Sequence, residues 1–130
     1  MASPRVVLVD DNPIFCEKLT ALLGAEFDVA ATAADGQSAL DIVCRIKPEV
    51  VVLDLGMPQL NGMQVTRELV KHGHTSIVIC SLETDPEVVE AALEAGAIGY
   101  VYKTRIEKDL ILAVKAAVHN RAFVSAVARQ

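Results

Sequence analysis

The chain alternates between short apolar runs and longer segments in which apolar residues recur every three or four positions. Short runs that are rich in valine, isoleucine and leucine, and that end in polar or turn-forming residues, are typical of buried strands. Five such runs are present, at residues 5–9, 27–31, 50–53, 76–80 and 97–102. The pattern therefore predicts five strands.

Amphipathic helices are predicted after each of these runs. Asparagine or aspartate followed by proline or glycine is typical of a helix start, and glycine or proline is typical of a helix end. The predicted helices begin near Pro13, Gly36, Gly62, Pro86 and Glu107, and they end near Gly24, Pro48, Lys71, Gly96 and His119.

Strands that alternate with helices across short loops indicate βαβ units and a parallel sheet. We therefore expect one α/β domain, a single doubly wound, five-stranded parallel sheet with five helices, at residues 1–119. Residues 120–130 are short, mixed in polarity and without a clear partner element. They are expected to be a C-terminal tail or the start of a linker.

Composition narrows the classes of function. The 130 residues carry a formal net charge of −5, and 52% of them are hydrophobic but only 4% aromatic, which predicts an aliphatic core. The negative charge argues against binding of nucleic acid or an anionic membrane by the chain itself. No segment approaches the roughly 18 consecutive apolar residues of a membrane span, and the N-terminus lacks an apolar signal segment. A soluble, cytoplasmic protein is expected.

The cysteines and histidines show no spacing that indicates a metal site or a disulfide. Cys16, Cys44 and Cys80 are odd in number and widely separated. All three are expected to be small buried hydrophobic residues. No role is assigned to the histidines at positions 72, 74 and 119.

Polar side chains stand where the predicted strands end. The first strand is followed by Asp10 and Asp11, the third by Asp54, the fourth by Ser81 and the fifth by Lys103. The carboxyl ends of parallel strands meet at one edge of the sheet, where ligands bind. Three carboxylates without a cation would repel one another, so the cluster predicts a hard divalent ion, Mg²⁺, bound by oxygen atoms.

A carboxylate, a metal ion, an ammonium group and a hydroxyl around one point suit phosphoryl transfer to the carboxylate. Asp54 would attack as the nucleophile, Lys103 would neutralise charge on the phosphoryl oxygens, and Ser81 would donate to one of them. Water would later hydrolyse the aspartyl phosphate. No glycine-rich phosphate-binding loop follows the first strand, so the donor is expected to be another protein or a small phosphoester rather than a nucleotide held here.

Four segments resemble the motifs of response-regulator receiver domains of two-component systems. They are VLVDD at 7–11, VVLDLGMPQLNG at 51–62, VICS at 78–81 and GYVYK at 99–103. The resemblance extends from residue 5 to about residue 119. It implies the strand order 2-1-3-4-5 and a chain that is not an enzyme beyond a slow autophosphatase activity.

The resemblance also assigns roles to individual residues. It implies that Asp54 is the phosphoacceptor and that Mg²⁺ is held by Asp10, Asp11, Asp54 and the backbone carbonyl of Gly56. Ser81 would follow the phosphoryl group, Lys103 would contact it, and Tyr100 would be an aromatic switch whose rotamer follows phosphorylation.

The last residues, VKAAVHNRAFVSAVARQ, resemble the tail of receivers in the NarL/FixJ subfamily, which typically leads to a LuxR-type DNA-binding domain. The expected function is to accept a phosphoryl group from a sensor histidine kinase and to switch the face of the fourth and fifth helices to control transcription. DNA would be bound only through an output domain outside this chain. Either the chain is part of a longer regulator or it is a stand-alone receiver.

The fifth helix carries a second apolar stripe beside its Leu110 stripe. It consists of Ile111, Val114 and Val118. A helix that is apolar on more than one face usually covers or pairs with something, which suggests a homodimer through this helix. Alternatively, these residues are simply tolerated there.

Each site residue also has an ordinary structural explanation. Asp10 and Asp11 could cap the first helix, Lys103 and Ser81 could be solvated strand-end residues, and Tyr100 could be a packed core residue. Two other classes of protein remain open: a pseudo-receiver that binds partners without phosphorylation, and a hydrolase of the haloacid-dehalogenase type. Against the hydrolase, the second residue after Asp54 is glycine rather than aspartate.

The chain departs from the receiver pattern at four positions. Thr104 follows Lys103 where many receivers have proline, and Leu82 follows Ser81 where a small residue is common. Gly56 and Glu83, each two residues past a site residue, flank the expected phosphoryl group. These two positions bear on the lifetime of the phosphorylated state.

Overall fold

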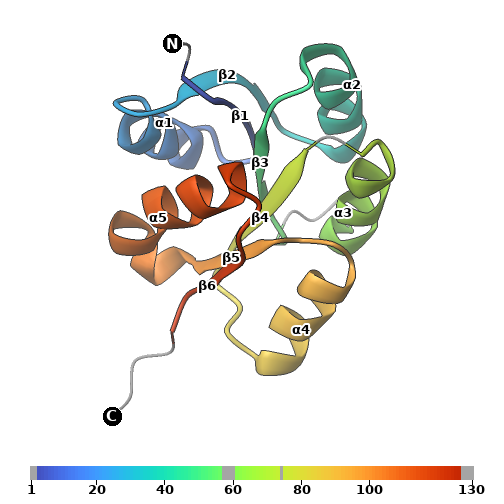
Figure 1. The fold of residues 1–130 in the computed structure, drawn as a ribbon, viewed down its shortest axis with the longest axis vertical. Helices are drawn as coiled ribbons and strands as arrows, with labels where there is room; N and C mark the ends of the chain where they lie inside the picture. Colours follow the sequence, from blue (N-terminus) through green and yellow to red (C-terminus); the bar gives the residue numbers. More distant parts are fainter. Residues whose placement is uncertain (1–2, 57–60, 74, 127–130) are drawn as a thin grey trace.

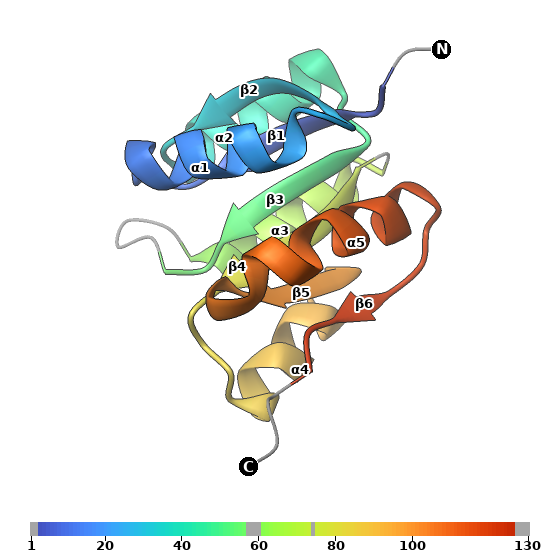
Figure 2. The same cartoon turned by 90° about the vertical axis from the view of Figure 1, so that its left-hand side faces the viewer.

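The computed structural model describes residues 3–56, 61–73 and 75–126, and it shows three layers (Figure 1). A six-stranded parallel sheet in the order β2-β1-β3-β4-β5-β6 lies between helices on both faces. Helices α1 and α5 cover one face, in front in Figure 2, and α2, α3 and α4 cover the other. The predicted parallel α/β fold and the order of its first five strands are confirmed.

The elements alternate along the chain as the pattern predicts. Their order is β1 (Arg5–Val9), α1 (Pro13–Leu23), β2 (Asp28–Ala33), α2 (Gly36–Ile46), β3 (Val50–Asp54), α3 (Gly62–Lys71), β4 (Ser76–Ser81), α4 (Pro86–Glu94), β5 (Gly99–Tyr102), the 3-10 turn η1 (Lys103–Arg105), α5 (Ile106–Val118) and β6 (Phe123–Val124).

Side chains at the helix starts explain where the helices begin. The Asn12 side chain accepts hydrogen bonds from the backbone N–H groups of Ile14 and Phe15, with Pro13 in the first turn of α1. Asp35, Asn61 and Asp85 cap α2, α3 and α4 in the same way. Each cap satisfies backbone donors that have no partner within the helix. Polar residues before each apolar stripe therefore fix where the helices begin.

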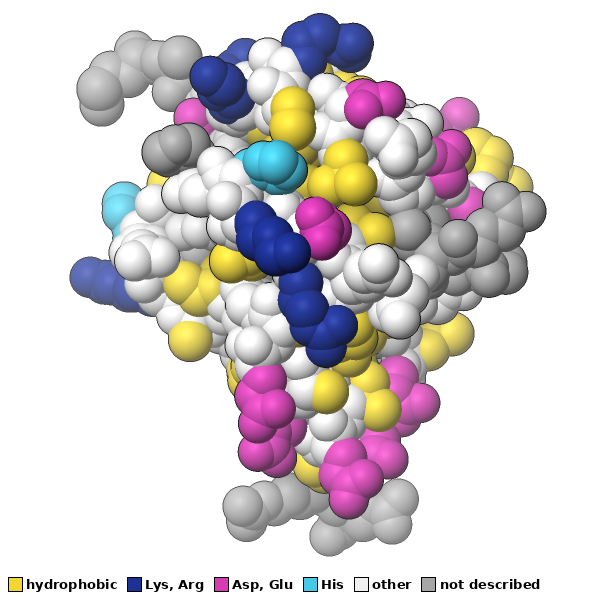
Figure 3. Space-filling view, turned by 90° about the vertical axis from the view of Figure 1, so that its right-hand side faces the viewer, with side chains coloured by type: hydrophobic (Ala, Val, Ile, Leu, Met, Phe, Trp, Pro, Cys, Tyr) yellow, Lys and Arg dark blue, Asp and Glu magenta, His cyan; other side chains and the backbone are white. Residues whose placement is uncertain are grey.

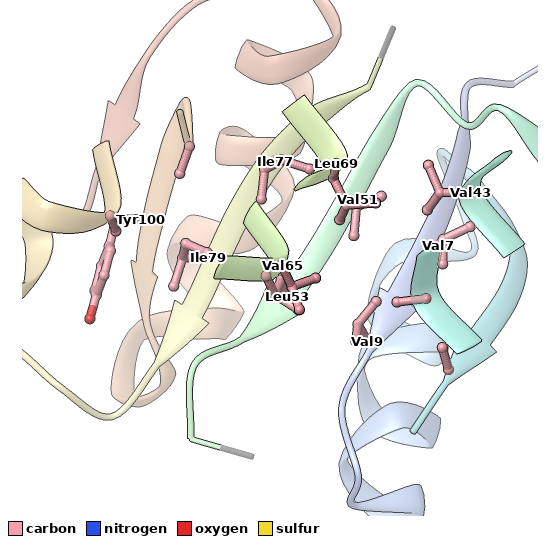
Figure 4. Close-up of a cluster of buried hydrophobic side chains, with 14 of the residues drawn as sticks. Val7, Val9, Val43, Val51, Leu53, Val65, Leu69, Ile77, Ile79 and Tyr100 are labelled. Atoms are coloured by element: carbon pink, nitrogen blue, oxygen red, sulfur yellow. The ribbon is translucent and has the colours of Figure 1, made fainter. Parts of the chain in front are cut away.

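The core is aliphatic, and the sheet divides it in two. The cluster under α2, α3 and α4 includes Val51, Leu53, Ile77 and Ile79 (Figure 4), and Tyr100 is a fully buried aromatic residue within it. The cluster under α1 and α5 is built from the alternate residues of the same strands. Both faces of the central strands are thus buried, which explains their uninterrupted apolar runs.

One prediction about burial was wrong. Cys44, expected to be buried, is exposed, whereas Cys16 and Cys80 are buried. A smaller residue of α2, Ala39, faces the sheet instead and is fully buried. In α4 the fully buried residue is likewise an alanine, Ala92, and Leu93 is 36% exposed.

The expectation of five strands was also wrong, because β6 adds a sixth beside β5. The backbone N–H of Phe123 donates to the Ile98 carbonyl at 3.2 Å, and that of Ser125 donates to the Tyr100 carbonyl at 2.9 Å. A strand of two residues is too short to produce an alternating pattern. Part of the segment 120–130 therefore does have a partner element, the edge of β5.

A buried polar network fixes the chain after β6. The Ser125 hydroxyl donates to Asp109 Oδ2 at 2.7 Å and accepts from the backbone N–H of Tyr102 at 3.2 Å. The Arg105 guanidinium also donates to Asp109 Oδ2, at 2.9 Å. Burial would raise the pKa of the Asp109 carboxyl, but these donors outweigh it, and the pKa is lowered. The network links the start of α5 to the sixth strand.

The second apolar stripe of α5 packs inside the molecule. Val114 is fully buried, and Ile111 and Val118 pack against the core cluster under α1 and α5. The stripe therefore covers the protein's own sheet. Leu112, which is 53% exposed, is the large apolar side chain of α5 that reaches solvent. None of the described helices is long and apolar enough to cross a membrane.

Acidic side chains are concentrated at one end of the face formed by α2, α3 and α4. Acidic side chains gather at the lower end of this face, where α4 lies, and lysine and arginine side chains lie above them (Figure 3). Helix α4 carries Glu87, Glu90 and Glu94 and no basic residue, whereas α3 carries Arg67 and Lys71 together with Glu68. A partner that docks on α4 would therefore meet a negatively charged surface.

We expect Asp109→Asn to lower the free energy of unfolding by about 1–2 kcal/mol at pH 7, because charge-assisted hydrogen bonds to Arg105 and Ser125 are weakened. The lowered pKa means that this stabilisation is present above about pH 4 and is lost as pH falls through the folded-state value. Urea unfolding at pH 7 and pH 3 should show the difference between wild type and variant shrinking at the lower pH.

Glu107→Gln is the matched control, since Glu107 lies in the same helical turn with a side chain that is 74% exposed. It should cost less than about 0.5 kcal/mol. Equal effects of the two substitutions at pH 7 would contradict a stabilising role of the Asp109 network.

Candidate functional site

The ends of four neighbouring strands, β1, β3, β4 and β5, bring the predicted site residues to one edge of the sheet. Asp10 directly follows β1, and its backbone N–H donates to the Ala33 carbonyl. Asp54 ends β3 and pairs with Cys80 in β4, so that Ser81 lies one residue farther along the neighbouring strand. Ser81 pairs in turn with Tyr102, which directly precedes Lys103. The parallel register thus assembles the site.

Asp10, Asp11 and Asp54 form an acidic cluster. Each can offer a carboxylate oxygen such that the three atoms lie within 4.8 Å of one another. Asp10 and Asp54 are buried, and Asp11 is exposed. Three hard oxygen donors that are partly open to solvent fit Mg²⁺, which prefers oxygen ligands and keeps several of its waters.

Lys103 supplies the positive charge of the site. Its ammonium nitrogen lies 3.2 Å from Asp54 Oδ2 and 3.4 Å from Asp10 Oδ2, and its side chain is 18% exposed. Burial opposes the charge of this group, but the carboxylates of Asp54 and Asp10 outweigh that effect and raise the pKa of Lys103. The lysine is therefore held as an ammonium between two acids.

The ionised form of Asp10 is disfavoured by its surroundings. Burial is the main cause of the raised pKa of its carboxyl, and the charge of Asp54 raises it further. The backbone N–H of Asn12, which donates to Asp10 Oδ1 at 2.9 Å, and the Lys103 ammonium act in the opposite direction. A second cation near these acids would relieve the remaining repulsion.

The other oxygen of Asp54 faces the loop that follows β3. The backbone N–H of Gly56 donates to Asp54 Oδ1 at 2.9 Å. A Cβ atom at Gly56 would lie 3.4 Å from the same oxygen, so glycine leaves room beside the carboxylate. Gly62 allows a close approach as well, because a Cβ there would clash with Leu55. Residues 57–60 of the predicted motif lie outside the described residues.

Ser81 and Tyr100 are both connected to Glu83 in the loop after β4. The Ser81 hydroxyl accepts from the backbone N–H of Glu83 at 3.0 Å. The Tyr100 hydroxyl donates to the Glu83 carbonyl at 2.8 Å. Burial raises the pKa of this tyrosine, and its ring meets that of Tyr102 edge-on, with centroids 5.9 Å apart (Figure 4 shows Tyr100). Tyr100 is thus a packed core residue whose polar end holds this loop.

One neighbour of the site was not predicted. The Lys103 ammonium lies 4.3 Å from the centroid of the Phe15 ring, which is a cation–π distance. Phe15 belongs to the apolar stripe of α1 that faces the core, and its side chain packs on the core under α1 and α5. This stripe gives no indication of a contact with Lys103, which is far away in the sequence.

Comparison with known proteins identifies this arrangement. Residues 6–115 match the response regulator receiver domain family. The chain belongs to this family. Its general function is to accept a phosphoryl group from a histidine kinase, and receiver domains bind Mg²⁺ at an acidic pocket. The predicted family is therefore confirmed, and the match argues against the haloacid-dehalogenase alternative.

Relatives of known name support the assignment. The chain is 32% identical over 123 residues to the transcriptional regulatory protein DegU of Brevibacillus brevis, covering 92% of this chain and 52% of DegU. It is 38% identical over 112 residues to the DNA-binding response regulator MtrA of Mycolicibacterium smegmatis, covering 86% of this chain and 49% of MtrA. The receiver thus spans about half the length of the curated relatives it matches.

Solved structures agree with these relatives. A LuxR-family two-component response regulator from Aurantimonas sp. SI85-9A1 superposes with a TM-score of 0.89 at 32% identity, covering 94% of this chain and 89% of that one. The signal receiver domain of the response regulator NarL from Mycobacterium tuberculosis superposes with a TM-score of 0.87 at 30% identity, covering 93% and 100%. These relatives are consistent with the NarL/FixJ subfamily.

We expect Asp10→Asn to raise the free energy of unfolding of the metal-free receiver by about 1 kcal/mol, because the substitution removes a buried charge that faces Asp54. The same substitution should abolish the rise in melting temperature that Mg²⁺ gives to the wild type, since a ligand of the ion is lost. Thermal unfolding in EDTA and in millimolar Mg²⁺ measures both effects.

Asp41→Asn, an exposed acid in α2, is the control for the loss of one negative charge. Its melting temperature should respond to Mg²⁺ as the wild type does. An undiminished response of Asp10→Asn would rule Asp10 out as a ligand.

Proposed function

We propose that this receiver accepts a phosphoryl group on Asp54 from a phosphohistidine of a sensor histidine kinase. The observation that carries the proposal is the position of Asp54 at the end of β3, with its Oδ2 at 3.2 Å from the Lys103 ammonium and with two further acids beside it. Asp54 is 7% exposed and stands at the edge of the sheet where the strands end.

In the proposed reaction a carboxylate oxygen of Asp54 forms a bond to phosphorus while the bond from phosphorus to the kinase imidazole nitrogen breaks. The nitrogen keeps the electron pair, so no oxidant or reductant is needed. Lys103 would place its charge against the phosphoryl oxygens, and the Ser81 hydroxyl would donate to one of them. Water would later cleave the phosphorus–oxygen bond, returning the carboxylate and inorganic phosphate.

The residues that would hold Mg²⁺ are Asp10, Asp11, Asp54 and the backbone carbonyl of Gly56. When bound, the ion would offset the negative charge of the carboxylates and of the phosphoryl oxygens. Gly56, which has no side chain, and Glu83, which is acidic, would flank the phosphoryl group. On this proposal the two residues set the rate at which water hydrolyses the aspartyl phosphate, which is the slow autophosphatase activity expected of the chain.

Tyr100 is the proposed switch residue. Its hydroxyl and the Ser81 hydroxyl are both tied to Glu83, so a movement of Ser81 toward a phosphoryl group would be felt by the same loop. The face formed by α4, β5 and α5 would then change shape and control the output. A useful response needs the two conformations to differ in phosphate affinity by several kcal/mol.

The partners follow from the family and from the relatives. We propose that a sensor histidine kinase donates the phosphoryl group and that the transfer takes place in the cytoplasm. The proposed output is control of transcription, as the names of DegU and MtrA indicate for those proteins. Residues 1–119 would be the receiver and residues 120–130 the start of a connection to a DNA-binding output domain. A homodimer through α5 stays a prediction, to be tested by light scattering with and without beryllofluoride.

We expect incubation with Mg²⁺ and acetyl phosphate to add one phosphoryl group, detected by intact mass, and we expect Asp54→Asn to remove this gain. Asp41→Asn should still be modified, since it changes an equal charge at an exposed position. A wild-type chain that neither gains mass nor binds beryllofluoride would instead support the pseudo-receiver alternative, in which the fold binds partners without phosphorylation.

We expect Tyr100→Phe to accept phosphate at a rate within about twofold of wild type, because the tyrosine hydroxyl holds the loop and not the phosphoryl group. Its loop after β4 should exchange amide hydrogens faster by about tenfold, which corresponds to loss of about 1.4 kcal/mol from one hydrogen bond. Hydrogen exchange with and without beryllofluoride would measure this. A loop that responds to beryllofluoride equally in both proteins would refute a switching role for the hydroxyl.

A further inference from the structure

The Lys103 ammonium has three close neighbours in the described residues, two carboxylates and one aromatic ring. Asp54 and Asp10 lie at 3.2 and 3.4 Å, and the centroid of the Phe15 ring lies at 4.3 Å. The ring faces the ammonium from α1, whereas the carboxylates approach from the ends of β1 and β3. The lysine is thus held from different sides by groups of different chemistry.

The position of Phe15 is fixed independently of the lysine. Its backbone N–H donates to the Asn12 side chain at 3.2 Å, in the cap that starts α1, and Pro13 restricts the same turn. The side chain packs against the core under α1 and α5. The ring therefore does not depend on the acids to keep its place.

The two carboxylates hold the lysine in a way that changes during the proposed reaction. In phosphorylated Asp54 the negative charge would lie on the phosphoryl oxygens and no longer on the carboxylate, and Asp10 would share its charge with a divalent ion. The ammonium would therefore have to exchange its present carboxylate partners for the phosphoryl oxygens. The attraction of the ring for a cation, which arises from the negative face of its π system, would remain.

We propose that Phe15 is a positioning residue for Lys103, which keeps the ammonium directed at the phosphoryl group while its anionic partners change from the carboxylates to the phosphoryl oxygens. The inference rests on the proposed phosphorylation of Asp54. It concerns the rate of that reaction and the stability of its product, to which Phe15 contributes through Lys103 without contact to the reacting atoms.

The aromatic face is the property that matters in this account. Leucine would fill much of the same space but would offer no negative surface to the cation. Tyrosine would keep the face, with its hydroxyl at the far end of the ring. Phe15→Leu and Phe15→Tyr therefore separate cation binding from packing.

The test is the initial rate of phosphorylation by acetyl phosphate at saturating Mg²⁺, followed by intact mass, with beryllofluoride affinity measured by calorimetry. Phe15→Leu should reduce both by about three- to tenfold, and Phe15→Tyr should stay within about twofold of wild type. In a Lys103→Met background, Phe15→Leu should change beryllofluoride affinity by less than about twofold, because the cation is gone.

Leu22→Ala is the matched control, since Leu22 is a half-buried residue of α1 that packs on the same core cluster. It should lower the melting temperature with little change in either measurement. Phe15→Met is a second variant in case Phe15→Leu folds poorly. A loss that is equally large with and without Lys103, or no loss at all, would overturn the inference. A wild-type chain that binds neither reagent would instead overturn the proposed function.

Discussion

The ion pairs that Lys103 makes with Asp10 and Asp54 are the interaction on which the site depends. The lysine and Asp10 are 93 residues apart in the chain. The parallel order β1-β3-β4-β5 brings the residues that follow β1 and β5 to the same edge of the sheet. Two buried carboxylates share one ammonium, so the negative charge is not fully balanced. Desolvated charges of this kind are unfavourable unless they are paired, which makes the region responsive to any added cation or phosphoryl group.

The rest of the molecule holds these charges in place with apolar packing. The central strands are buried on both faces by the helices that cover them, and the site lies at the edge where these strands end. Tyr100 differs from the aliphatic residues around it, because this fully buried side chain carries a hydroxyl that lies where the core meets the loop after β4. Packing and polar contacts therefore meet at the residue for which a switching role is proposed.

Much of this structure could be predicted from the sequence because its signals are local. A run such as Val50 to Leu53 followed by Asp54 defines both a buried strand and the place where it ends, and Asn12 before Pro13 defines a helix start. The parallel topology then brings the strand ends together. The placement of Asp10, Asp11, Asp54 and Lys103 follows from these facts.

What could not be predicted depends on contacts between distant parts of the chain or on very short elements. Phe15 fits the apolar pattern of α1 and is therefore expected to be a core residue. No nearby residue in the sequence indicates its contact with Lys103. The two residues of β6 are recognisable only beside the open edge of β5. Cys44 was expected to be buried because cysteine usually is, but Ala39 and Val43 already occupy the face of α2 that meets the sheet.

The sixth strand has a consequence for how the chain leaves the domain. Because β6 runs parallel to β5, its carboxyl end points to the same edge of the sheet as Asp54 and Ser81. The hydrogen bonds of Ser125 to Tyr100, Tyr102 and Asp109 then tether the exit point to the strand that precedes Lys103. The described part of the chain accordingly ends on the side of the molecule where Asp54 and Ser81 lie, and the sheet sets its path up to residue 126.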